Sequence, residues 1–137
     1  MSEVLSLGEV VRPNRPRVKP ESMRETLRKL SEAAYRAGPE SIVDRAKDAA
    51  QWAVGTWLAA LRNEPDLRKK DLGKLAAALD GEATAVTQGV SKALARLHAR
   101  GKPNVQEEKG SRDVTEDDAE FALATVGLLL REIGWAL

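Results

Sequence analysis

The stretch ALARLHARGKPN, residues 93–104, contains the only histidine of the 137-residue chain. Histidine is the side chain whose intrinsic proton affinity suits general acid or base chemistry near neutral pH, which makes His98 the candidate catalyst. Cations recur around it at steps of four residues, at Lys92, Arg96 and Arg100. On a helix such steps share one face, so these three side chains predict a cationic ridge that could hold phosphates.

Within one chain, however, His98 and this ridge do not converge. On an unbroken helix His98 lies about 240° around the axis from Lys92 and about 200° from Arg96. Lys92 and His98 would meet only if the helix ends early or if a second subunit completes the site. His98 is therefore either a catalyst paired with Lys92 or a structural or exposed helix-end histidine.

Other kinds of chemistry lack candidate residues in this sequence. The chain has no cysteine, which excludes a disulfide framework and a thiolate zinc site, and one histidine is too few for the usual His-based metal sites. No phosphate-cradling glycine loop and no Ser-His-Asp pattern is present. We therefore expect neither a metal nor a cofactor.

Charge is segregated along the chain, although 22 Lys and Arg against 21 Asp and Glu give a net charge of only +1. Residues 91–112 carry six Lys or Arg against two Glu, whereas residues 113–137 carry six Asp or Glu against one Arg. This pattern predicts either a nucleic-acid contact or a solvated helix face that balances the acidic segment. The predicted phosphate contacts are Lys92, Arg96, Arg100 and Lys102, joined by Arg12, Arg15 and Arg17 near the N-terminus.

Those last three arginines belong to a proline-rich segment, whose prolines remove backbone donors and favour extended conformations. Residues 1–19 are thus predicted to form an extended, partly disordered basic arm, and residues 20–137 a helical domain. A helical period predicts helices over about 20–38, 41–62, 70–79, 82–100 and 115–137. The fold class predicted is an all-α bundle of four to five helices.

The apolar residues of these helices predict which faces are buried. The helix over 41–62 is the most apolar of the first half and is expected at the centre, with Ala60 on its buried stripe and with Trp52 and Trp57 in the core or a dimer interface. The helix over 82–100 is expected to bury Ala83, Val86, Val90, Leu94 and Leu97, and to expose Gln88.

The last helix is expected to begin at Thr115 as its cap, with three carboxylates in its first turn, and to continue to the C-terminus. It is apolar over so wide an arc that it must be covered on more than one side. It therefore forms either the bundle centre or a subunit interface. The predicted interface residues are Trp52, Trp57, Leu129 and Trp135.

The start of the chain lacks the features of a signal peptide, and no apolar run reaches the roughly 20 residues that span a bilayer. We therefore expect a soluble, cytoplasmic protein without a membrane partner.

The second half of the chain resembles a known family. HARGKPN, a polar loop and then DVTEDDAEFALATVGLLLREI resemble the end of the HEPN domain of the abortive-infection C-terminal type, and SIVDRAKDAAQWAVGTWLAAL resembles its long apolar helix. The likeness covers about residues 39–135. It implies a helical bundle that dimerises and, in active members, cuts RNA without metal, using an Arg and a His spaced R-x4–6-H at the dimer cleft. His98 would match the family histidine.

Lys92 stands where the family has its arginine, and lysine keeps the charge but not the bidentate fork. The resemblance thus implies a domain that binds or processes RNA in a prokaryotic defence or stress system, with metal-independent ribonuclease activity left open. The alternative is a non-enzymatic helical adaptor, which forms a homodimer or docks a protein partner through its apolar last helix.

Overall fold

The computed structural model describes residues 20–36, 38–79, 85–100 and 113–135. These ranges contain five α-helices and one short 3-10 helix, and no strand, which confirms the predicted all-α bundle. The basic arm, Ala83 and Lys102 lie outside the described residues. The helices are α1 (Pro20–Arg36), α2 (Pro39–Arg62), α3 (Leu72–Ala78), α4 (Ala85–Arg100) and α6 (Glu116–Glu132), with the 3-10 helix η1 (Pro65–Lys69) between α2 and α3.

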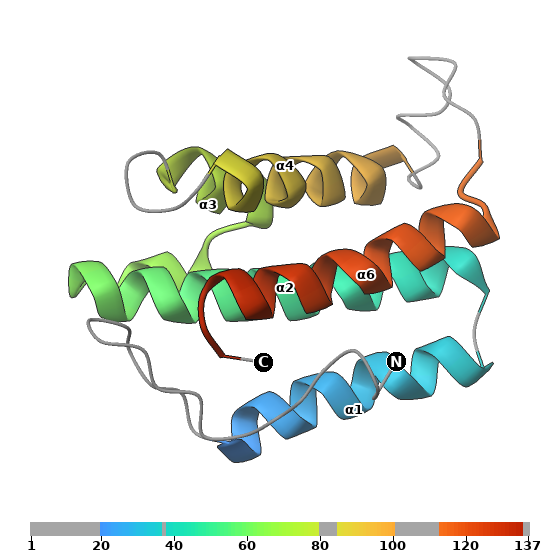
Figure 1. Ribbon diagram of the computed structural model, residues 1–137, viewed down its shortest axis with the longest axis horizontal. Coiled ribbons are helices and arrows are strands. Elements are labelled where there is room, and N and C mark those ends of the chain that lie inside the picture. Colours follow the sequence, from blue (N-terminus) through green and yellow to red (C-terminus); the bar gives the residue numbers. More distant parts are fainter. Residues whose placement is uncertain (1–19, 37, 80–84, 101–112, 136–137) are drawn as a thin grey trace.

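The helices lie in three tiers, with α3 and α4 in one outer tier, α2 and α6 in the middle and α1 in the other outer tier (Figure 1). Helix α2 contacts each of the other four α-helices and η1. Its buried residues lie around most of its circumference, because it is covered on several sides. This confirms the central position expected for the most apolar helix of the first half, although Ala60, expected to be buried, is exposed.

Local signals set the ends of α2, and a glycine sets how closely it packs. Pro39 occupies its first turn, and the helix stops at Asn63, whose φ of 55° lies in the left-handed region that asparagine tolerates. In mid-helix, a Cβ on Gly55 would lie 3.3 Å from the carbonyl oxygen of Leu67 and 3.4 Å from the Cδ1 atom of Leu75. Glycine at this position therefore lets η1 and α3 approach α2 closely.

Helix α4 buries a different face from the one expected. Leu94 and Leu97 are buried as predicted, but Val86 is 51% exposed, and the prediction for it is wrong. Thr87 and Ser91 take its place on the buried side. The hydroxyl of Ser91 donates a hydrogen bond of 2.8 Å to the Thr87 carbonyl, which removes most of the cost of burying it.

Helix α6 begins at the predicted cap. The Thr115 hydroxyl accepts a hydrogen bond from the backbone N–H of Asp118, whose carboxylate accepts one of 2.9 Å from the backbone N–H of Thr115. This reciprocal pair satisfies two backbone donors at the start of the helix. The expectation that the helix continues to the C-terminus is wrong, since it ends at Glu132, two residues before Gly134 with its φ of 83°.

Three of the four predicted interface residues are core residues instead. Trp57, Leu129 and Trp135 are buried within the chain, where they pack in one apolar cluster. Trp57 thus lies in the core, one of the two places expected for it, and Leu129 and Trp135 expose almost no surface to a partner. Trp52 is half-buried, and its ring lies 6.1 Å from that of Trp135, centroid to centroid, with the planes tilted by 54°.

Candidate nucleic-acid interface

Helices α3 and α4 lie side by side (Figure 1), and each of them carries at least one exposed cation. A Cβ on Gly73, in the first turn of α3, would lie 3.9 Å from the Cβ of Ala95 in α4. Lys74 follows Gly73 and is exposed. On α4, Lys92 and Arg96 are exposed and lie about 60° and 100° around the axis from Ala95, both on the same side. The contact between Gly73 and Ala95 thus joins Lys74 to the cations of α4.

Three more exposed cations, Arg68, Lys69 and Lys70, precede α3 in and just after η1, which packs on α2. We call the surface formed where α3 meets α4 the basic face; it consists of Lys74, Lys92 and Arg96. Lys92 and Arg96 were predicted from the sequence, whereas Lys74 was not. Lys74 ends the run RKKDLGK, which indicates only a polar connection until α3 is known to pack on α4.

Among the described residues, none of these three cations forms an ion pair or a hydrogen bond through its side chain. The surface of α1 is different: the Arg28 guanidinium lies 2.7 Å from a Glu25 carboxylate oxygen and also contacts Glu32. The hydrogen bond from Arg28 lowers the pKa of Glu25. The charge of Arg28 is thus neutralised by its neighbours on α1, whereas the charge on the basic face remains available to an anionic partner.

The structure does not place the other predicted phosphate contacts on the basic face. Arg100 is the last residue of α4 and is half-buried. Lys102 and the arm residues Arg12, Arg15 and Arg17 lie outside the described residues, so their contact with phosphate stays a prediction.

His98 faces into the bundle, away from the basic face. Helix α4 is continuous to Arg100, so an early helix end does not bring His98 to Lys92. The imidazole Nε2 atom lies 3.0 Å from a carboxylate oxygen of Asp44 in α2, and the His98 side chain is 20% exposed. The structure thus pairs His98 with Asp44, a contact between helices that no local pattern in the sequence could indicate.

A polar row on α2 holds both α3 and α4 in place. Asp44, Lys47 and Gln51 follow one another at steps of three and four residues, which places them on one side of the helix. The Lys47 ammonium lies 3.9 Å from the carboxylate of Asp71, the residue that precedes α3, and the side-chain Oε1 atom of Gln51 accepts a 3.0 Å hydrogen bond from the backbone N–H of Leu72. With the contact between Asp44 and His98, this row fixes the helices that carry the basic face.

Gln88 ties α3 to α4 directly. Expected on the solvent side, it is half-buried, and its side-chain amide donates a hydrogen bond of 3.0 Å to the Ala76 carbonyl. The expectation that it belongs to the exposed ridge is therefore wrong.

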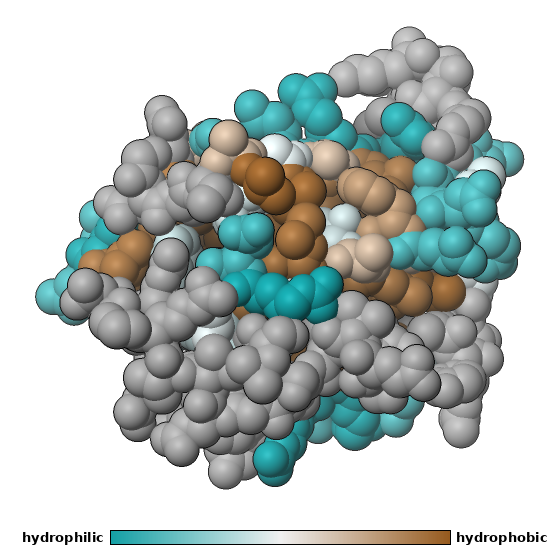
Figure 2. Space-filling view, in the orientation of Figure 1, coloured by the Kyte–Doolittle hydropathy of each residue, from teal (hydrophilic) through white to brown (hydrophobic). Residues whose placement is uncertain are grey.

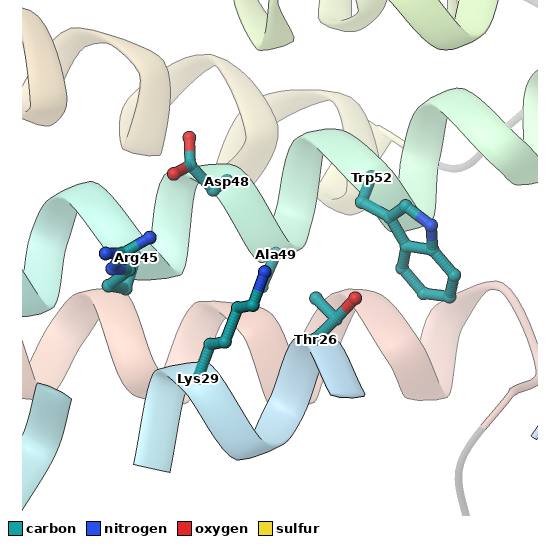
Figure 3. Close-up of a pocket in the computed structure, with 6 residues that line it drawn as sticks. All are labelled: Thr26, Lys29, Arg45, Asp48, Ala49 and Trp52. Atoms are coloured by element: carbon teal, nitrogen blue, oxygen red, sulfur yellow. The ribbon is translucent and has the colours of Figure 1, made fainter. Parts of the chain in front are cut away.

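A small pocket opens between α1 and α2, in a different tier from the basic face (Figure 3). Figure 3 shows Lys29 and Thr26 reaching towards it from α1, with Trp52 at one end of the α2 side. Its volume of about 160 Å³ is below the roughly 300–1,000 Å³ of most small-molecule sites. It is lined by Thr26, Lys29, Arg45, Asp48, Ala49 and Trp52.

Comparisons with protein-family models, with curated proteins and with solved structures return no match. Within the described ranges, no three His, Cys, Asp or Glu side chains gather as a metal site would require. Nor does any helix there combine the length and apolar character needed to cross a membrane. The basic face, built on two helices that α2 holds in register, is thus the best-defined candidate site.

Proposed function

We propose that this chain is a HEPN-like helical domain that binds RNA through the basic face. The observation that carries the proposal is the group of three exposed cations, Lys74, Lys92 and Arg96, that α3 packing on α4 brings to one surface, none of them neutralised by a described residue. Lysine and arginine side chains in such an array bind phosphates and release the counterions condensed on them. Lys92 and Arg96, one helical turn apart, stand about 6 Å apart along the axis.

Reversing two of these charges tests the proposal. The double variant Lys92→Glu, Arg96→Glu is expected to bind RNA at least about tenfold more weakly at 0.1 M salt, because each lost phosphate contact removes one counterion-release term. Fluorescence anisotropy against salt concentration measures the affinity, and the logarithmic salt slope is expected to fall by about 1–2.

The matched control is Arg24→Glu, Lys29→Glu, which makes the same change of net charge on α1. It is expected to leave the affinity within about threefold, because exposed charges more than a Debye length from the ligand are screened. An equal loss in both double variants would contradict a site at the basic face.

The placement of His98 favours binding over cleavage, because its imidazole contacts Asp44 and points away from Lys92. We therefore expect the purified chain to bind RNA and leave it intact. Cleavage that survives chelation of metals and is lost in His98→Ala would overturn this expectation and identify the chain as a metal-independent ribonuclease.

A separate observation favours the adaptor as a second candidate function. The outward side of α6 carries apolar residues at steps of three and four: Phe121, which is 43% exposed, exposed Ala124 and half-buried Leu128. Figure 2 shows hydrophobic surface across the middle of the face on which α6 lies. Burying such a stripe against another molecule would be favourable.

If α6 is a self-association surface, light scattering will give about twice the chain mass of 14.9 kDa. Phe121→Asp will then be monomeric, because a carboxylate in an apolar interface is costly to desolvate. Val86→Asp is the matched control, since Val86 is similarly exposed but lies on α4. A monomeric wild-type chain would contradict self-association through α6.

A further inference from the structure

The aromatic residues of this chain lie away from the basic face. The sequence has five of them, and none falls between residues 58 and 120, the stretch that contains η1, α3, α4 and their connections. Trp57 and Trp135 are buried, Trp52 lines the pocket between α1 and α2, and Phe121 lies on α6. The remaining one, Tyr35, belongs to α1, which shares no tier with α3 and α4 (Figure 1).

The amide and hydroxyl side chains of α3 and α4 are also unavailable to a ligand, because they are buried or hydrogen-bonded within the protein. These two helices contain three of them, Thr87, Gln88 and Ser91. Thr87 and Ser91 are buried, and the Gln88 amide binds the Ala76 carbonyl. On these helices the basic face therefore presents cations without free amides or hydroxyls, so guanine is the base whose edge its side chains are suited to bind.

These two observations decide which form of nucleic acid such a surface prefers. Proteins that bind single strands gain about 1–3 kcal/mol per base by stacking bases on aromatic side chains, and this surface has none. Its binding depends on phosphates alone, and each neutralised phosphate releases more counterion from a duplex, with a salt slope of about 0.9, than from a single strand, at about 0.7. A cation array held rigidly on two helices also suits the regular backbone of a duplex.

We infer that the basic face binds the phosphate backbone of double-stranded nucleic acid without reading its sequence. This inference rests on the proposed function; it favours duplexes over single strands as the ligand and extends the expected binding to DNA duplexes. An RNA duplex and a DNA duplex offer the same phosphate chemistry, so a surface that binds through phosphates is expected to bind both.

The test measures dissociation constants of the full chain by fluorescence anisotropy for three probes: a 16-base-pair RNA duplex, one of its strands with an unstructured sequence, and the DNA duplex of the same sequence. The RNA duplex is expected to bind at least about fivefold more tightly than the single strand, and the DNA duplex within about threefold of the RNA duplex. Shuffling the duplex sequence is expected to change neither value.

The possible contrary results separate the duplex inference from the proposed function. Equal or tighter binding of the single strand, with sensitivity to Lys92→Glu, Arg96→Glu retained, overturns the duplex inference and leaves the proposed function standing. A difference above about tenfold between the two duplexes overturns recognition by backbone charge alone. Absence of binding to all three probes overturns the proposed function itself. Phe121→Ala serves as a further check, because a loss of affinity in this variant would show that stacking contributes.

Discussion

Replacing Trp57 with alanine is expected to lower the free energy of unfolding by about 3–5 kcal/mol. Trp57 is fully buried on α2, the helix that contacts every other helix of the bundle, so its removal leaves a cavity that the surrounding helices fill only in part. A domain of this size is usually stable by about 5–15 kcal/mol, and the substitution therefore removes a large share of the total.

Urea denaturation followed by circular dichroism measures this loss. Phe121→Ala is the control, since Phe121 is an aromatic residue of similar chemistry but is 43% exposed; it is expected to cost less than about 1 kcal/mol. Should Trp57→Ala fail to fold, Trp57→Phe provides the measurement, because it removes less volume and is expected to cost less than the alanine variant. Equal costs for Trp57→Ala and Phe121→Ala would contradict the position of α2 at the centre.

The helix positions could be predicted from the sequence because the signals that set them are local. Pro39 and the Asn63 to Pro65 stretch mark the ends of α2, and Thr115 with Asp118 marks the start of α6. Each of these acts through its own backbone geometry or through hydrogen bonds within one turn. Such effects do not depend on the rest of the fold.

The buried face of α4 could not be predicted in the same way. A period of apolar residues assigns Val86 to the core and leaves Ser91 outside it, yet the structure reverses the two. The reason is that the Ser91 hydroxyl is satisfied by the carbonyl one turn earlier and is small enough to allow close packing. The spacing of apolar residues in the sequence contains no information on this hydrogen bond or on the small size of the side chain.

The candidate site could likewise be predicted only in part, because it combines residues that are far apart in the sequence. Lys92 and Arg96 are one turn apart, and their common face follows from the helical period alone. Their grouping with Lys74 depends on the contact between Gly73 and Ala95, and the pairing of His98 with Asp44 joins residues 54 positions apart. Contacts of this range are determined by how the helices pack, which no local pattern contains.

The rotation of α4 about its axis determines which of its residues contribute most to the free energy of unfolding. Leu94→Ala is expected to lower the free energy of unfolding by about 2–5 kcal/mol, because Leu94 is fully buried. Val86→Ala, on the same helix and 51% exposed, is expected to cost less than about 0.5 kcal/mol. Urea denaturation of the two variants compares the costs directly.

The comparison also tests the basic face, because the rotation that buries Leu94 is the rotation that turns Lys92 and Arg96 outwards beside α3. In this orientation Leu94→Ala lowers stability but leaves RNA affinity unchanged under folding conditions, since Leu94 and the cations lie on different sides of α4. A larger cost for Val86→Ala than for Leu94→Ala would mean that α4 is rotated about its axis. The cations of α4 would then no longer share a surface with Lys74, and the proposed interface would lose the contact on which it is built.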